Sequence, residues 1–240
     1  MSIQAVLFDL DGTLLPMEQD AFVKAYFGLL ARHLAPLGYQ PEAVVSSIWA
    51  GTAAMVKNDG TKTNEEAFWQ VFALQNGEKS LEHKAYLDEF YLEKFDGAQQ
   101  ACGYHPEAAK AVRAIREMGL RTILATNPIF PAAATRRRMA WAGLSSEDFE
   151  LYTTYENSHS CKPNLSYYRE ILKTTGLSAE DCLMVGNDVG EDMVASELGM
   201  KVFLLTDCLI NQKGIDISIY PNGSFAQLME YVTALSEGCI

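Results

Sequence analysis

The sequence has few cysteines, and their spacing argues against the usual cysteine-based sites. Five occur among 240 residues, an odd number, and no two stand in the C-x-x-C arrangement that is typical of zinc and redox sites. We therefore expect reduced thiols, which are usual in a cytoplasmic protein, rather than a disulfide framework. The five cysteines are Cys102, Cys161, Cys182, Cys208 and Cys239.

Positive charge is also scarce. The 19 Lys and Arg residues stand against 31 Asp and Glu residues, and the formal net charge of −12 produces a long-range field that repels polyanions. Binding of nucleic acid or of an anionic membrane through a general basic surface is therefore not expected. An anionic ligand would need positive groups placed locally around it.

Long hydrophobic runs are missing as well. No apolar stretch approaches the roughly 18–20 residues that span a bilayer. The first residues, Met1 to Gln4, carry no basic stretch ahead of an apolar run, which is unlike a signal peptide. We expect a soluble cytoplasmic protein, and nothing in the pattern indicates its oligomeric state.

The sequence does contain a series of short apolar runs, each followed by a polar loop. Helical patterns precede three of them, over residues 106–118, 164–175 and 191–198. Such alternation predicts an α/β fold, a Rossmann-like parallel sheet with helices on both faces. The predicted strands cover residues 5–8, 122–125, 182–185 and 202–205.

A long helical segment separates the first predicted strand from the second. The 112 residues between Thr13 and Thr126 far exceed the roughly 30 residues of a simple strand–helix–strand unit. Apolar-periodic segments around 21–37, 41–56, 64–75 and 80–95 predict helices, and no strand pattern occurs among them. We expect a mobile all-α helical cap at 16–96, inserted into an α/β core made of residues 1–15 and 97–240.

The first candidate site residues are Asp9 and Asp11, at the end of the first predicted strand. Ligands of parallel sheets collect at the carboxyl ends of the strands. A carboxylate such as Asp9 can attack phosphorus and form an aspartyl-phosphate. A second carboxyl group such as Asp11 can protonate the leaving oxygen and then activate water.

Two further loops offer groups that bind phosphate. Thr126 and Asn127 directly follow the second predicted strand, and the threonine hydroxyl and backbone N–H groups are neutral donors for phosphate oxygens. Lys162, which precedes Pro163, supplies a positive charge that would screen the phosphate from Asp9.

The loop after the third predicted strand is acidic. Asp188 and Asp192 are four residues apart, which places them on one face of a helical turn, and Glu191 is expected to face away. Magnesium prefers oxygen ligands and usually keeps several waters. One or two of these carboxylates, together with Asp9, would therefore form a magnesium site.

Each feature alone has a simpler explanation. Aspartates at strand ends often cap helices, acids in a first helical turn often compensate the helix dipole, and a single lysine is usually solvated. The four features occur in order, however, and together they resemble the haloacid dehalogenase superfamily. The D-x-D-G-T motif stands here as residues 9–13, the second motif ends at Thr126, Lys162-Pro163 matches the third, and residues 186–192 match the fourth.

The resemblance implies a role for each candidate. Asp9 would be the nucleophile and a magnesium ligand, and Asp11 the general acid and base, with its backbone carbonyl on the metal. Asp188 would bind magnesium directly, and Asp192 directly or through water. The residues expected to hold the phosphoryl group are Thr126, Asn127 and Lys162.

The predicted activity is magnesium-dependent hydrolysis of small phosphorylated metabolites. A sugar-phosphate mutase would use the same residues, and phosphonate- or halide-cleaving relatives generally lack the second acid. A non-catalytic phosphate-binding protein would need neither Asp9 nor Asp11.

Substrate identity is expected to reside in the cap, where the sequence says least. Five cap residues are candidates for the pocket, although aromatic residues at helical spacing more often pack in a core. They are Tyr26, Trp49, Lys57, Lys62 and Trp69. The run of arginines at 136–138 is expected to form a solvated helix face, and His159 to be a solvated loop residue.

Overall fold

The computed structural model describes residues 3–238, so that Met1, Ser2, Cys239 and Ile240 lie outside the described residues. Its sheet has six strands in the order β3-β2-β1-β4-β5-β6, and all neighbouring pairs are parallel. The predicted α/β fold is thereby confirmed. The strands are β1 Ala5–Phe8, β2 Arg121–Leu124, β3 Leu151–Tyr152, β4 Cys182–Gly186, β5 Lys201–Leu205 and β6 Asn222–Gly223.

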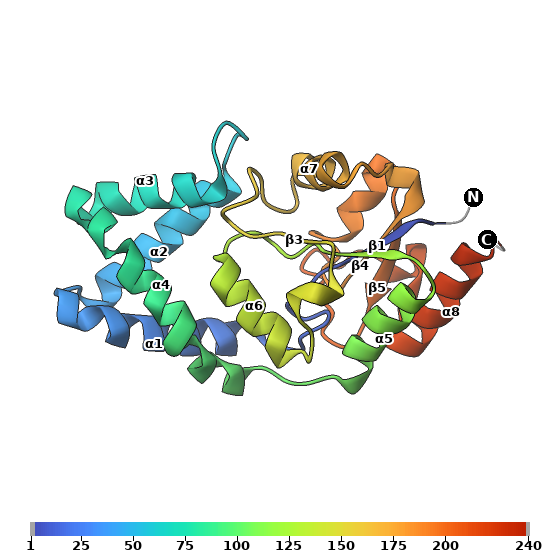
Figure 1. Cartoon of the computed structure of the whole chain (residues 1–240), viewed down its shortest axis with the longest axis horizontal. Coiled ribbons are helices and arrows are strands. Elements are labelled where there is room, and N and C mark those ends of the chain that lie inside the picture. The colour runs from blue at the N-terminus through green and yellow to red at the C-terminus, as the bar shows by residue number, and fades with distance from the viewer. Residues whose placement is uncertain (1–2, 239–240) are drawn as a thin grey trace.

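Helices cover both faces of the sheet because successive side chains of each strand point to opposite sides (Figure 1). Val6 and Phe8 of β1 belong to one hydrophobic cluster, together with helices α5 (Pro106–Glu117), α6 (Ala132–Trp141) and α8 (Phe225–Ser236). Ala5 and Leu7 belong to a second cluster, together with α7 (Leu165–Thr175). The central strand is fully buried, as its continuous apolar run predicts.

The first four of the five α-helices between β1 and β2 form an insertion, which lies at the opposite end of the molecule from both termini (Figure 1). They are α1 (Gln19–Leu34), α2 (Pro41–Val56), α3 (Asn64–Asn76) and α4 (Lys84–Glu93). Helix α3 starts with a capping box, in which Thr63 and Glu66 each accept a hydrogen bond from the other's backbone N–H. The limits of a separate cap domain at 16 and 96 remain a prediction.

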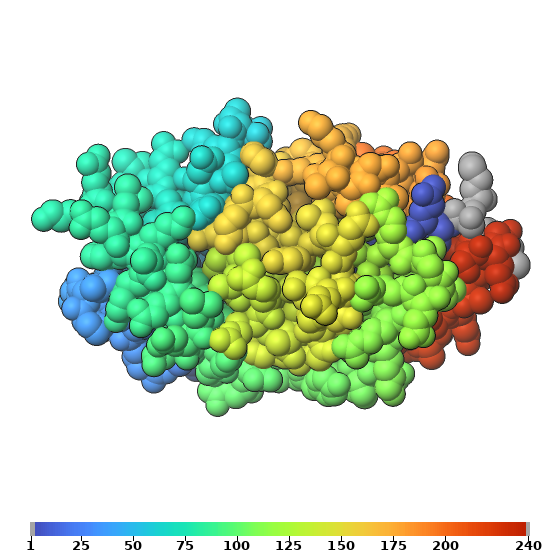
Figure 2. Space-filling view, in the orientation of Figure 1, coloured from blue at the N-terminus to red at the C-terminus, as the bar shows by residue number. Residues whose placement is uncertain are grey.

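A buried asparagine joins this helical insertion to the rest of the molecule. The Asn64 side chain donates to the carbonyl oxygens of Pro128 and Ser160 at 3.2 and 3.3 Å, and its backbone N–H donates to the Ser158 carbonyl at 2.8 Å. Figure 2 shows the corresponding contact between the cyan end of the insertion and the yellow loop near residue 158. The start of α3 is thus attached to the loop that leads to Lys162.

The structure corrects some details of the expected elements. Strands β3 and β6 were not expected, because two residues are too short for any hydrophobic pattern, and pairing with β2 and β5 defines them. The segment 191–198 contains a short 3₁₀ helix, Met193–Leu198, instead of an α-helix. Helix α7 begins after its N-cap Asn164, so Pro163 lies before the helix. The peptide bond between Lys162 and Pro163 is cis.

Two expectations about the cellular location of the protein concern its cysteines and its helices. The four cysteines within residues 3–238 are free. Over the same range, none of the helices combines the length and apolar character needed to cross a membrane. A cytoplasmic location stays a prediction.

Two helical glycines provide a test of how closely α2 and α3 pack. A Cβ atom on the buried Gly51 of α2 would lie 2.4 Å from a ring carbon of Phe68, whereas a Cβ on the exposed Gly28 of α1 would meet nothing within 4 Å. We expect Gly51→Ala to lower the free energy of unfolding by about 1–3 kcal/mol through overpacking. Gly28→Ala should raise it by about 0.5–1 kcal/mol because alanine favours a helix. Urea denaturation measures both, and equal effects would contradict the predicted packing.

Candidate active site

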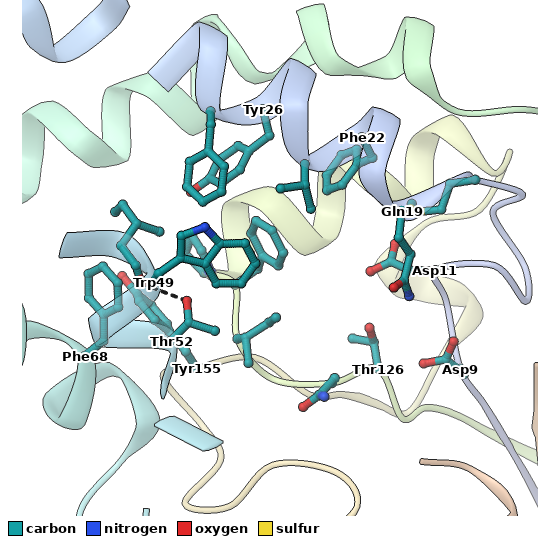
Figure 3. A pocket seen from close by; sticks show the side chains of 18 of the residues that line it. Asp9, Asp11, Gln19, Phe22, Tyr26, Trp49, Thr52, Phe68, Thr126 and Tyr155 are labelled. Carbon is teal, nitrogen blue, oxygen red and sulfur yellow. Dashed lines mark hydrogen bonds between the residues drawn. The ribbon is translucent and has the colours of Figure 1, made fainter. Parts of the chain in front are cut away.

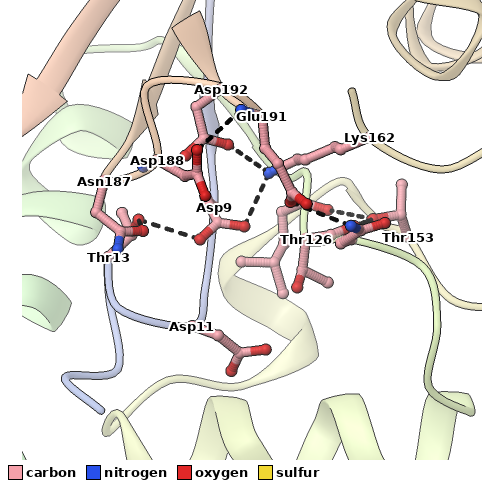
Figure 4. A network of polar contacts seen from close by, with 12 residues as sticks. Asp9, Asp11, Thr13, Thr126, Thr153, Lys162, Asn187, Asp188, Glu191 and Asp192 are labelled. Atoms are coloured by element: carbon pink, nitrogen blue, oxygen red, sulfur yellow. Dashed lines mark hydrogen bonds and ion pairs between the residues drawn. The ribbon is translucent and has the colours of Figure 1, made fainter. Parts of the chain in front are cut away.

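The centre of the candidate site is the carboxylate of Asp9, immediately after β1. Its backbone N–H donates to the Val185 carbonyl of β4 at 2.9 Å, which fixes the end of the strand. One carboxylate oxygen accepts from the Lys162 ammonium at 2.8 Å, and the other accepts from the Thr13 hydroxyl at 3.1 Å (Figure 4). Asp9 is therefore held from two sides within a largely buried site.

Lys162 pairs with two carboxylates at once. Its ammonium donates to Asp9 at 2.8 Å and to Asp192 at 2.6 Å, and its side chain is only 1% exposed. Burial by itself lowers the pKa of Lys162, but the charges of Asp192 and Asp9 outweigh burial and raise that pKa well above its usual value. Burial raises the pKa of Asp192, and the charge of Lys162 opposes this shift.

The loop after β4 places Asp192 and Asp188 beside this pair. The Asp188 backbone N–H donates to the second Asp192 carboxylate oxygen at 3.0 Å. Asp188 uses one of its own oxygens to accept from the backbone N–H groups of Gly190 and Glu191. Gly186 makes this turn possible, because a Cβ atom there would lie 2.0 Å from the Asp192 side chain.

Asp11 lies apart from this cluster (Figure 4). Its carboxylate forms an ion pair with Arg138 of α6, whose side chain is 0% exposed and whose guanidinium lies 4.4 Å from the centre of the Phe130 ring. Burial raises the pKa of Asp11 to about 6 even though Arg138 lowers it. The expectation of a solvated arginine run is wrong for Arg138, because α6 turns this residue into the core.

Thr126 and Asn127 follow β2 at the same edge of the sheet. The Thr126 carbonyl accepts from the hydroxyls of Thr153 at 2.6 Å and Tyr167 at 2.8 Å, which fixes the loop. The Asn127 amide donates to the Glu191 carboxylate at 3.1 Å. Glu191 thus faces the site, and the expectation that it faces away is wrong.

All these loops border one cavity of about 300 Å³ between the sheet and the inserted helices (Figure 3). Asp9, Asp11 and Thr126 lie at one end, and Tyr26, Trp49 and Phe68 lie at the other. Six of the seven residues predicted to act in catalysis, phosphate binding or metal binding line this cavity, and the seventh, Lys162, contacts Asp9 from the side. The six are Asp9, Asp11, Thr126, Asn127, Asp188 and Asp192. His159 does not line it, and its ring nitrogen is 2.6 Å from Glu170.

Sequence patterns missed three contributors to the site. Arg138 was expected on a solvated helix face. Asn187 belongs to the fourth motif but had no assigned contact. Its side-chain oxygen lies 2.9 Å from the Thr13 hydroxyl and shares the single hydroxyl proton with Asp9, and its amide donates to the Cys208 carbonyl at 2.7 Å. Thr13 belongs to the first motif but had no assigned contact. The one indication that Arg138 is buried is its position four residues after Ala134, which places both residues on the same face of the helix, and Ala134 is buried.

The donor set suits a hard divalent cation. Within residues 3–238 no three Asp, Glu, His or Cys side chains form a group able to hold a metal by themselves. Magnesium, however, is commonly bound by one or two carboxylates together with substrate phosphate and water. Asp9 and Asp188 both line the cavity, and one oxygen of Asp188 has no hydrogen-bond partner within the described range. The residues therefore fit magnesium, provided that the substrate and water complete its coordination.

The family model of the haloacid dehalogenase-like hydrolases matches residues 3–197. The chain belongs to this family. This match confirms the family resemblance that the four motifs indicated.

Three similar proteins illustrate the range of the family. A Bacillus subtilis protein named "Putative phosphatase YhcW" is 25% identical over 203 residues, which cover 85% of this chain and 83% of that protein. A 2-haloacid dehalogenase from Pseudomonas syringae has a TM-score of 0.63 at 20% identity, over 97% of this chain and 98% of the other. Bacillus subtilis YfnB, solved with bound magnesium, has a TM-score of 0.55 at 16% identity, over 97% and 99%. The two solved structures establish the fold.

The ion pair of Arg138 with Asp11 gives a prediction for stability. Arg138→Met removes the partner of the Asp11 carboxylate, whose side chain is 24% exposed at the cavity, so we expect the free energy of unfolding to fall by about 1–3 kcal/mol. Arg136→Met changes an exposed arginine of the same helix and should shift it by no more than about 0.5 kcal/mol. Chemical denaturation of both variants checks this, and similar stabilities would show that the pair contributes little.

Proposed function

We propose that this hydrolase is a magnesium-dependent phosphomonoesterase that acts on small phosphorylated metabolites through an aspartyl-phosphate on Asp9. The observation that carries the proposal is the placement of Asp9. Its carboxylate borders the cavity, is fixed by Lys162 and Thr13, and shares the cavity with a second acid, Asp11. A nucleophile and a proton donor in one cavity are what cleavage of a phosphate ester requires.

The reaction takes two steps at Asp9. In the first, a carboxylate oxygen of Asp9 bonds to phosphorus, the bond from phosphorus to the ester oxygen breaks, and Asp11 gives its proton to the departing alcohol. In the second, Asp11 accepts a proton from water, whose oxygen attacks the phosphorus and releases inorganic phosphate and free Asp9. The buried guanidinium of Arg138 stabilises Asp11 in its carboxylate form between the two steps.

The charge of the cavity supports a requirement for magnesium. Five carboxylates line the phosphate end, and no Lys, Arg or His side chain lines the cavity within residues 3–238. A phosphate group entering such a site needs an added cation to offset repulsion. The five are Asp9, Asp11, Asp188, Glu191 and Asp192.

Asp9, Asp188 and the Asp11 backbone carbonyl would hold the ion. When bound, it would neutralise phosphate charge and act as a Lewis acid. Both carboxylate oxygens of Asp192 already accept hydrogen bonds, from Lys162 and from Asp188, which favours a role for Asp192 through water. Thr126, Asn127 and Lys162 would hold the phosphoryl oxygens.

The similar proteins support this choice. The relative from Bacillus subtilis carries a phosphatase name, and YfnB was solved with magnesium. The haloacid dehalogenase neighbour raises the alternative of carbon–halogen cleavage, in which the leaving halide needs no proton. The presence of Asp11 in the cavity therefore favours phosphate esters.

Replacement of the nucleophile tests the proposal directly. Asp9→Asn should lower phosphatase activity on a generic aryl phosphate at least about 1,000-fold, because an amide cannot form the covalent intermediate. The exposed Asp216, the N-cap of a short 3₁₀ helix, provides a matched control, since Asp216→Asn keeps a good cap and should leave activity unchanged. Measurement of free phosphate distinguishes hydrolysis from the mutase reaction, because a mutase returns the phosphoryl group to a sugar and releases no phosphate. Labelled phosphate on a peptide without Asp9 would refute the mechanism.

Metal removal provides an independent test. We expect chelation by EDTA to abolish activity and added Mg²⁺ to restore it, because five cavity carboxylates otherwise repel the phosphate. The measurement is the initial rate against free Mg²⁺ concentration. Full activity in EDTA after extensive dialysis would contradict the proposed metal dependence.

A further inference from the structure

Apolar and aromatic side chains make up most of the half of the cavity formed by the inserted helices, and Gln19, Thr52 and Asp88 are its polar members. It is lined by Phe22, Tyr26, Ile48, Trp49, Phe68 and Leu87. Figure 3 shows Trp49 projecting into the middle of this region, with Tyr26 and Phe68 around it and the Asp9 end farther away. We define this region by those six residues as the apolar subsite.

Several polar groups around the apolar subsite already have protein partners, although the indole N–H of Trp69, which also lines the cavity, has none within residues 3–238. The Tyr26 and Tyr91 hydroxyls bond to each other at 2.8 Å, and the Thr52 hydroxyl donates to the Ile48 carbonyl at 2.9 Å. A ligand with many hydroxyl groups would lose its hydration here without gaining equivalent hydrogen bonds. The wall therefore favours apolar groups over sugars.

The charge around the subsite is unfavourable for a second anion. Asp88 of α4 lines the cavity, and burial raises its pKa, as do the nearby charges of Glu65 and Glu156, whereas Lys84 lowers it. Lys84 is itself paired with Glu65. The two cap lysines considered from sequence, Lys57 and Lys62, do not line the cavity.

From these observations we infer the chemical class of the substrate. We propose that the apolar subsite binds the organic part of a phosphate monoester that is apolar, contains a ring, and carries no second anionic group. This inference rests on the proposed phosphatase function. Stacking on Trp49, Tyr26 and Phe68 supplies the recognition, and a cavity of about 300 Å³ is at the small end of the range for ligand pockets.

Substrates that differ in one property each provide the test. We would compare kcat/KM for ethyl phosphate, benzyl phosphate and 4-carboxybenzyl phosphate in the presence of Mg²⁺. Benzyl phosphate should be favoured over ethyl phosphate by at least about 10-fold, as expected for burial of a ring. The added carboxylate should reduce kcat/KM by at least about 10-fold relative to benzyl phosphate. Equal values for the three substrates would overturn the inference while leaving the phosphatase function intact.

Two variants connect the selectivity to named residues. Trp49→Ala should lower the benzyl-to-ethyl ratio of kcat/KM about 10-fold. The control is Leu74→Ala, which changes an exposed residue of α3 outside the cavity and should leave the ratio unchanged.

Asp88→Lys should raise the ratio of kcat/KM for 4-carboxybenzyl phosphate to that for benzyl phosphate about 10-fold. The control is Glu89→Lys, which changes the exposed neighbour of Asp88 and should leave this ratio unchanged. Each readout is a ratio of two kcat/KM values for the same variant, so partial misfolding lowers both values equally and does not change the ratio. Unchanged ratios in Trp49→Ala and Asp88→Lys would refute the subsite.

A binding measurement separates the two hypotheses. Tryptophan fluorescence can follow titration with benzylphosphonate and with 4-carboxybenzylphosphonate, which cannot be hydrolysed as esters. Tighter binding of benzylphosphonate by at least about 10-fold supports the apolar subsite even if the enzyme cleaves no phosphate ester. Equal binding overturns it, and hydrolysis of ethyl phosphate that depends on Asp9 would still support the phosphatase function.

Discussion

The contact of Lys162 with Asp9 and Asp192 is the interaction on which the site depends. A buried ammonium is costly without partners, and one carboxylate from the end of β1 and another from the loop after β4 supply them. The same pairing lets two acids approach each other inside the protein. It also leaves the cluster with more negative than positive charge, so that a bound cation would complete the balance when phosphate enters.

A second buried cation organises the other acid. Arg138 reaches Asp11 from α6 and keeps it apart from the Lys162 cluster, so that each of the two acids of the first motif has its own partner. This separation is consistent with the two different tasks that we propose, attack for Asp9 and proton transfer for Asp11. The cavity then changes character over its length, from carboxylates at the sheet to aromatic rings at the inserted helices. A substrate with one charged end and one apolar end fits that gradient.

Local pattern explains why much of the fold could be predicted. The apolar run at residues 5–8 is buried on both faces and forms β1, and the helical periodicity at 41–56 coincides with α2. Strands β3 and β6 could not be predicted, since two residues carry no periodicity and exist as strands only through pairing. The segment before β5 was expected to be an α-helix, but the Asp188 loop occupies its first turn with side-chain hydrogen bonds, and only a 3₁₀ helix follows.

The sequence by itself determined the family, the parallel sheet and the order of the loops that carry the candidate site residues, because these depend on residue types at fixed distances along the chain. The tertiary structure decided which groups meet. It turned Arg138 inward onto Asp11 and Glu191 toward Asn127, and it collected aromatic rings from α1, α2 and α3 around one cavity while leaving Lys57 and Lys62 outside. Helical spacing cannot distinguish a ring that lines a cavity from one that fills a core, because both face inward, and only the packing of neighbouring helices leaves space between them.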